Sequence, residues 1–163
     1  MYDMSILEED EAFLTLVNEL KQRRRPNDIK EVINHYNGES LYVREMILPA
    51  GCLVIGRVHL HSFVNFMLEG AMRLWSSDRP NARIVKAPDI FESGAGVRRA
   101  MITFTNVRFA TAQGTGHIPD WVAVDDSMDN EKILDLFTCN TRTEYNQFLE
   151  LRGQNGKIQD LRS

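Results

Sequence analysis

Short hydrophobic runs separated by turn-forming residues set the strongest limit on how this 163-residue chain can fold. From Leu41 to Gln113 such runs recur roughly every 8 to 12 residues, and Pro, Gly, Asn and Asp stand at the breaks between them. Runs at this spacing are typical of an antiparallel sandwich or barrel, because each strand can pair with a neighbour through a tight turn. We therefore predict a mostly β core.

The segments that flank this core have helical patterns instead. Four segments place apolar residues at helical spacing, and the last opens with a capping pattern, Thr141 followed by Glu144. The predicted helices are Ser5–Arg25, Asp28–Tyr36, Asp129–Phe137 and Thr141–Arg152. The length of the chain suits one domain. The expected parts of this domain are N-terminal helices in 1–38, a β core in 41–113, C-terminal helices in 127–152 and a frayed tail in 153–163.

Charge and hydropathy exclude several classes of protein. The net charge is −4, whereas a general nucleic-acid-binding protein carries an excess of Lys and Arg to neutralise phosphates. No apolar run reaches the ~18 residues that a membrane helix needs, and the N-terminal segment is acidic, unlike a secretory signal. We expect a cytoplasmic protein that binds neither membranes nor nucleic acids in general. Cys52 and Cys139 are too few for a disulfide framework, and we expect both to be reduced.

Two histidines stand out because of their spacing. His59 and His61 are two residues apart in a predicted strand, so their side chains should point to the same face. One strand can offer two imidazoles to one metal ion in this way. Paired histidines of this kind also occur as plain polar residues on a strand, and the spacing alone does not decide between the two interpretations.

The two histidines belong to a longer pattern that begins at Gly51 and ends with V-N-F-M-L-E-G at Gly70. This pattern resembles the first motif of the cupins, a family of small jelly-roll barrels. The resemblance implies a cupin-type antiparallel jelly-roll barrel with helical appendages at both ends. Where the family usually places a Glu, four residues after the second His, this chain has Asn65. A neutral amide is a poorer ligand than a carboxylate for divalent transition metals.

The second cupin motif corresponds to Gly94–Arg99, and the third His of the family falls at Arg99. A guanidinium stays protonated and cannot replace a neutral imidazole as a ligand. The resemblance thus leaves His59, His61 and Asn65 for a divalent transition metal, which would need water or substrate to complete its ligands. We expect no tightly bound cofactor.

Without a metal, an inward-pointing Arg99 would set a fixed positive charge inside the jelly roll. Arg57 shares the strand face of His59, and Arg73 lies on the strand after Gly70. Arginine binds carboxylates and phosphates through paired donors. The leading hypothesis is therefore a non-enzymatic protein that binds a small anionic molecule, with Trp75 as an aromatic wall. The predicted ligand-binding residues are Arg57, His59, His61, Asn65, Arg73 and Arg99.

Three alternatives remain open. The arginines could instead form structural ion pairs, with the candidate partners Glu45, Glu69 and Glu92. The chain could be a weakly metal-dependent cupin enzyme of the isomerase or oxygenase kind. It could also be a structural or host-interaction protein, because the order of its features and the phrase GAGVRRA are similar to small cupin-like proteins of tailed phages, which implies the host cytoplasm.

Three further expectations concern assembly and packing. Exposed strand edges and an apolar terminal helix predict a homodimer. We expect His117, in the predicted loop Thr115–Asp126, to be a surface residue. The phenylalanines of the predicted strands should lie in the core: Phe63, Phe66, Phe91, Phe104 and Phe109.

Overall fold

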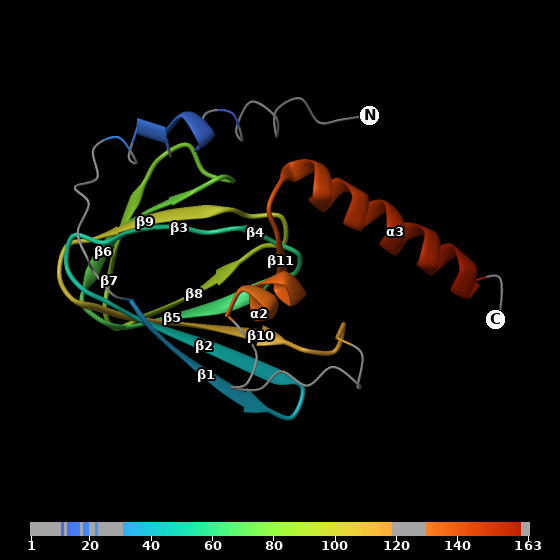
Figure 1. Cartoon of the computed structure of the whole chain (residues 1–163), viewed down its shortest axis with the longest axis horizontal. Coiled ribbons are helices and arrows are strands. Elements are labelled where there is room, and N and C mark those ends of the chain that lie inside the picture. The colour runs from blue at the N-terminus through green and yellow to red at the C-terminus, as the bar shows by residue number, and fades with distance from the viewer. Residues whose placement is uncertain are drawn as a thin grey trace.

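Two antiparallel sheets dominate the computed structural model of the chain (Figure 1). It describes residues 11, 13–16, 18, 19, 22, 31–118 and 130–160, with side-chain burial in the last segment given for 132–153. The first sheet has the order β1 (Val32–Gly38), β2 (Leu41–Leu48), β10 (Val107–Gly114), β5 (Phe63–Glu69) and β8 (Asp89–Ser93). The second has the order β3 (Leu53–Ile55), β9 (Arg99–Thr103), β6 (Ala71–Ser76) and β7 (Arg83–Lys86). A short pair joins β4 (Val58–His59) to β11 (Thr138–Cys139), and the helices are α2 (Asn130–Phe137) and α3 (Arg142–Asp160).

The strand pairs are nested around one central hairpin. The hairpin β6·β7 lies innermost along the chain, and β5·β8, β3·β9 and β2·β10 enclose it in turn. A long hairpin folded over in this way is a jelly roll, with successive strands crossing between two sheets. The predicted fold class is therefore confirmed. In the described part of the chain the two sheets face each other without closing into one continuously hydrogen-bonded barrel.

Strand β1 corrects the helix predicted over Asp28–Tyr36. Residues 32–38 pair with β2 along their whole length, from Val32 opposite Ile47 to Gly38 opposite Leu41. The open edge of β2 satisfies the backbone groups of this segment, and β-branched residues such as Val32 favour the extended form. The apolar spacing that suggested a helix was thus overridden by sheet pairing. Residues 28–30 lie outside the described residues.

The C-terminal helices follow the prediction at their beginnings. The N–H of Glu144 donates to Thr141 Oγ1 at 3.1 Å, and its carboxylate accepts from the N–H of Asn140, which caps α3. Helix α3 continues to Asp160, so the prediction of a frayed tail from residue 153 is wrong up to that residue; residues 161–163 are not described. Figure 1 shows α3 leading away from the sheets. No helix in the described part of the chain combines the length and the hydropathy needed to cross a bilayer.

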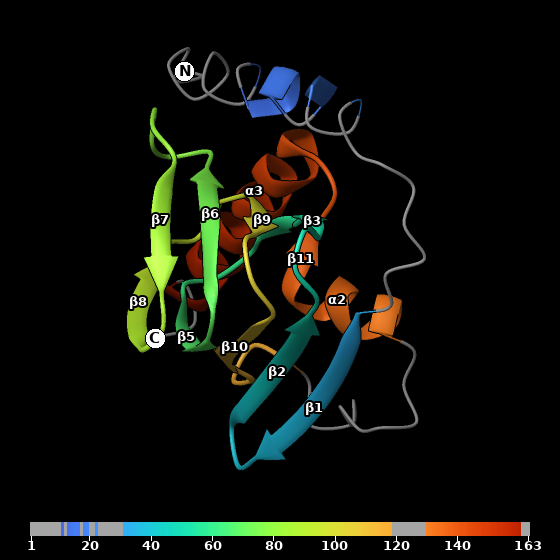
Figure 2. The same ribbon diagram turned by 90° about the vertical axis from the view of Figure 1, so that its left-hand side faces the viewer.

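Part of the predicted N-terminal helix is also observed. Residues 11, 13–16, 18, 19 and 22 are helical, and the other residues of Ser5–Arg25 lie outside the described residues. Phe13 is buried against Ala100, Ile55 and Trp75. This helix therefore covers the outer face of the second sheet, as the two views in Figures 1 and 2 agree.

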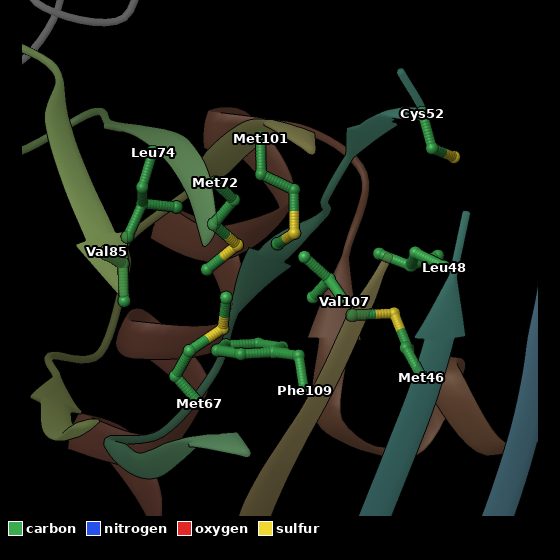
Figure 3. Close-up of a cluster of buried hydrophobic side chains, with 10 residues drawn as sticks. All are labelled: Met46, Leu48, Cys52, Met67, Met72, Leu74, Val85, Met101, Val107 and Phe109. Carbon is green, nitrogen blue, oxygen red and sulfur yellow. The ribbon is translucent and has the colours of Figure 1, made fainter. Parts of the chain in front are cut away.

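Most of the space between the sheets is filled by one apolar cluster that is rich in methionine (Figure 3). Its members are Met46, Leu48, Cys52, Met67, Met72, Leu74, Val85, Met101, Val107 and Phe109. Of the phenylalanines predicted for the core, Phe63 and Phe109 are buried, while Phe66 and Phe91 are partly buried. The prediction is wrong for Phe104, which lies beyond the end of β9 and is 47% exposed.

Candidate functional site

A cavity of about 240 Å³ lies between the sheets, at the end where α2 and β11 adjoin β4. Leu134 of α2 and Thr138 of β11 form part of its wall. The polar or charged side chains that line the rest of it are Glu31, Arg44, Arg57, His59, Arg99, Thr111 and Gln113. Met46, Met101 and Phe109 separate this polar end from the apolar cluster, because they belong to both.

Alternation along two neighbouring strands creates this division. On β2, Tyr42, Met46 and Leu48 are buried, and Arg44 stands between them on the same inward face. On β10, Phe109 is followed at intervals of two by Thr111 and Gln113. The inward face of β2 is therefore interrupted by the charge of Arg44, and that of β10 changes from apolar to polar after Phe109.

Arg99 is the most buried arginine of the site. It is 5% exposed, and its Nη2 donates to Asn65 Oδ1 at 2.9 Å, while its Nη1 has no hydrogen-bond partner among the described residues. The guanidinium carbon lies 4.8 Å from the ring centre of Phe63 and 5.8 Å from that of Phe91. Burial, aided by Arg83 and opposed by Asp78, lowers the pKa of Arg99 to about 10. Among the described residues no carboxylate forms a salt bridge with it.

Asn65 positions Arg99 and does not line the cavity. Its side chain is fully buried, and Nδ2 donates to the carbonyl of Phe91 at 3.1 Å and to Ser93 Oγ at 3.0 Å. These two bonds fix the amide so that its oxygen faces the guanidinium. The residue at the usual Glu position of the family therefore holds a cation in place without neutralising its charge.

His59 contributes a neutral ring to the cavity. Its imidazole stacks on Phe63 with 4.0 Å between ring centres, and its Nδ1 has no partner among the described residues. Burial, followed by the charges of Arg99 and Arg44, lowers the pKa of His59 to about 3. This histidine is therefore uncharged near neutral pH.

The structure does not bring His61 to the same cavity. Strand β4 ends at His59, and the chain bends before the alternation of side chains can reach His61. His61 lines a separate open cavity of about 380 Å³ with His117, Phe148, Leu151 and Arg152. Its pKa is lowered, by burial first and then by the nearby His117 and Arg152.

The residues near the two histidines do not fit a metal ion. No group of three or more His, Cys, Asp or Glu side chains in the described part of the chain could hold one. Asn65 faces Arg99, so His59 is the one remaining residue of the implied metal ligands in the cavity wall. Neither Cys52 nor Cys139 forms a disulfide in the described part of the chain, and Cys52 is buried.

His117 is not the isolated surface residue that its loop position suggested. Its ring centre lies 4.1 Å from that of His61, and its Nε2 is 3.2 Å from the carbonyl oxygen of Leu136. It connects the loop before α2 to the segment after β4.

Arg57 lines the cavity and forms an ion pair, although not with a predicted partner. Its Nη1 lies 2.6 Å from Asp135 Oδ1 of α2. The carboxylate of Glu45 accepts instead from Arg108 Nε at 2.7 Å, on the outer side of the sheet. Neither Glu69 nor Glu92 is a partner of Arg57 or Arg99 in the ion pairs of the described residues.

Two other predicted site residues lie outside the cavity. Arg73 is exposed on β6, with its guanidinium carbon 5.7 Å from the ring centre of Phe104. Trp75 packs with Phe13 and Ala100 on the outer face of the second sheet, so it is not an aromatic wall of the site. The prediction for Arg73 and Trp75 relied on their position in the sequence. In the structure both alternate with the buried Met72 and Leu74 along β6, so their side chains point away from the space between the sheets.

Sequence reasoning missed three inward polar side chains, Arg44, Thr111 and Gln113. Extending the period of two from Tyr42 along β2, and from Phe109 along β10, would have found them. Arg44 is the most informative of the three, because burial lowers its pKa while Tyr42 and Glu31 oppose this effect.

Comparisons with known proteins found similar solved structures at low sequence identity. No family model and no curated protein matches the chain. A cupin superfamily protein of Desulfitobacterium hafniense is 10% identical, with a TM-score of 0.46 over 56% of this chain and 81% of that one. An RmlC-like cupin family protein of Methanocaldococcus jannaschii is 15% identical, with a TM-score of 0.47 over 56% and 85%. The cupin domain of Cnp3 from Schizosaccharomyces pombe is 13% identical, with a TM-score of 0.47 over 57% and 67%. At these identities the strand order, and not the likeness, identifies the fold.

Proposed function

We propose that this protein binds a small organic anion or phosphate in the cavity between its sheets. The observation that supports this most directly is Arg99, a buried cation with one neutral hydrogen-bond partner and no salt bridge to a carboxylate in the described chain. Burying a charge is costly unless an opposite charge or further hydrogen bonds compensate for it. An anion in the cavity would supply this compensation.

The other cavity residues suit the same ligand. Arg44 and Arg57 add donors that bind carboxylate or phosphate oxygens, and Thr111 and Gln113 add neutral polar groups. The volume of about 240 Å³ limits the ligand to a small molecule. The described residues bring no three metal-ligating side chains together, so they do not point to the metal-dependent enzyme that was the alternative.

A titration with a matched pair of variants tests this proposal. Isothermal titration calorimetry with succinate and with inorganic phosphate would measure affinity for the wild type, Arg99→Met and Arg73→Met. Arg73 is an exposed arginine outside the cavity, so its replacement controls for the loss of one positive charge. We expect Arg99→Met to weaken binding by about tenfold or more, and Arg73→Met to change it little. Equal affinities in all three proteins would contradict the proposal.

Three predictions from the sequence remain predictions. These are the homodimer, the cytoplasmic location and the likeness to cupin-like proteins of tailed phages. Strands β1 and β7 stand at the ends of their sheets in the described chain, which is compatible with pairing to a second copy. The proposed anion site is contained in one chain and does not depend on such pairing.

A further inference from the structure

The outer face of the five-stranded sheet is largely apolar. An antiparallel sheet that packs on a core with one face usually exposes polar side chains on the other. On this sheet, however, six large hydrophobic side chains alternate with inward-pointing ones and are 40–66% exposed. They are Val32, Tyr36, Leu41, Ile47, Leu68 and Ile90. The described chain therefore leaves an apolar surface in contact with water, which is a feature of protein interaction sites.

The most buried charged group of this face is already neutralised within the chain. Glu45 points outward on β2 but is only 4% exposed. Its carboxylate accepts hydrogen bonds from Asn34 at 2.9 Å, from Tyr36 at 3.4 Å and from Arg108 at 2.7 Å. Because this carboxylate is satisfied, the face suits an apolar protein surface better than a nucleic acid or a small ion.

The relief of the face is complementary to itself. Strand β5 presents bulky side chains, Val64 and Phe66, whereas β10 beside it presents Ala110 and Ala112. In the register of the two strands, Phe66 is opposite Ala110 and Val64 is opposite Ala112. Ala112 also lies in the wall of an open hollow of about 950 Å³, so the surface is recessed beside the bulky strand. A ridge and a groove therefore run side by side.

We infer that a second copy of this chain packs on this face, with a two-fold axis parallel to the strands between β5 and β10. Such an axis places β5 of each copy over β10 of the other, so Phe66 of one chain faces Ala110 of the second copy. The same axis brings Arg108 opposite Glu69 of the second copy, because these two residues are also opposite in the register. Bulky side chains thus meet a groove, and positive charge meets negative charge. The inference does not depend on the proposed anion site.

The face is large enough for a stable dimer. Its five strands are about 4.8 Å apart and about seven residues long at ~3.4 Å per residue, so they cover roughly 600 Å². Protruding side chains raise the accessible area toward the ~800 Å² that each partner buries in a typical stable interface. Pairing through the edge of β1 or β7 alone would leave this apolar face exposed.

Sedimentation velocity of the full chain tests the dimer. We expect the wild type to form a dimer of twice 18.7 kDa, with a Kd of about 10 µM or below. Ala112→Arg places a charge in the groove, and Glu69→Arg opposes Arg108 of the second copy. Each should raise the Kd about tenfold or more. Ile84→Arg is the matched control and should leave the Kd unchanged, because Ile84 is 54% exposed on the outer face of the other sheet.

Circular dichroism of each variant separates loss of folding from loss of association, and if one of the two interface variants fails to fold, the other decides. A wild type that stays monomeric up to about 1 mM would overturn the inference. So would a dimer whose Kd neither interface variant changes, because it would then form through another surface, such as the edge of β1 or β7. Equal weakening by Ile84→Arg would also overturn it, since the effect would not be specific to this face.

Discussion

Arg99 and Asn65 form a buried polar pair in which only one member is charged. The amide oxygen of Asn65 accepts one hydrogen bond from the guanidinium, and its two N–H bonds go to Phe91 and Ser93. A Glu at this position would form an ion pair with Arg99 and neutralise it. Because Asn orients the guanidinium and leaves its charge intact, the positive charge remains available to a ligand.

At the scale of single residues, His59 predicts a pH dependence of stability. Its pKa in the folded protein is about 3, against an ordinary value of about 6.5, so the unfolded chain takes up a proton between these values while the folded chain does not. Stability should therefore fall as the pH drops below about 6.5, by at most about 1.4 kcal/mol per pH unit from this residue. The free energy of unfolding, measured with urea, should change less between pH 7.0 and pH 5.5 for His59→Gln than for the wild type. An unchanged difference would contradict the assignment.

The candidate site could be predicted from the sequence only where strands are long enough to keep their alternation. The cupin-like register correctly placed His59 in the cavity wall and Arg99 inside the jelly roll. The same reasoning failed for His61, because β4 is two residues long and ends before it. It also could not find Asp135, whose contact with Arg57 spans 78 residues of sequence and depends on how α2 docks.

Among the elements, the turn between β5 and β6 depends on Gly70. This residue has a φ of +86°, and a Cβ atom there would overlap the carbonyl oxygen of Asn106 and the hydroxyl of Thr105. Another side chain would therefore meet both backbone strain and a steric clash with the neighbouring turn.

We predict that Gly70→Ala lowers the free energy of unfolding by more than about 2 kcal/mol. Gly51→Ala is the matched control, because Gly51 also has a positive φ, of 77°, but has open space around its Cβ position. Its cost should be limited to about 1 kcal/mol of backbone strain. Urea denaturation of both variants measures the two values, and similar losses would show that the clash at Gly70 is relieved by movement of the turn.

The central strands of the fold could be predicted from the sequence, whereas the edge strand β1 and the end of α3 could not. The core strands followed from alternation and turn residues between Leu41 and Gln113, since each buries one face against the opposite sheet. The strand at Val32–Gly38 did not, because its pairing depends on an open edge of β2 that no local pattern reveals. The continuation of α3 beyond Arg152 runs through Gly153, a residue of low helical propensity, and local sequence therefore predicted an end there.

The whole molecule has one apolar end and one basic end between the same two sheets. The apolar cluster stabilises the fold by burial, whereas the buried charge of Arg99, which has no salt bridge in the described chain, opposes it. Binding capacity and stability are therefore in conflict at this residue until an anion is present.

This conflict predicts that the order of the melting temperatures of the wild type and Arg99→Met depends on whether a ligand is bound. Without ligand, Arg99→Met should unfold at the same temperature as the wild type or higher, because a thioether of similar length needs no counterion. At about 100 times the wild-type Kd, a bound anion should stabilise the wild type by about 2.7 kcal/mol, a rise of roughly 5 to 10 °C in Tm, and should stabilise the variant, which binds tenfold or more weakly, by about 1.4 kcal/mol at most. Scanning calorimetry with and without succinate measures both. A lower Tm for Arg99→Met in the absence of ligand would show that the guanidinium is already compensated.

Met46 and Met101 belong both to the apolar cluster and to the wall of the cavity, so the floor of the site is made of unbranched, flexible side chains. Methionine changes rotamer at little cost and fills irregular space that a branched side chain would leave empty. The arginines and the deformable thioethers of the cavity wall divide the task of recognition: the arginines select the charge of a ligand, and the thioethers tolerate differences in its length and shape. Such a protein would sort molecules by charge more strictly than by size.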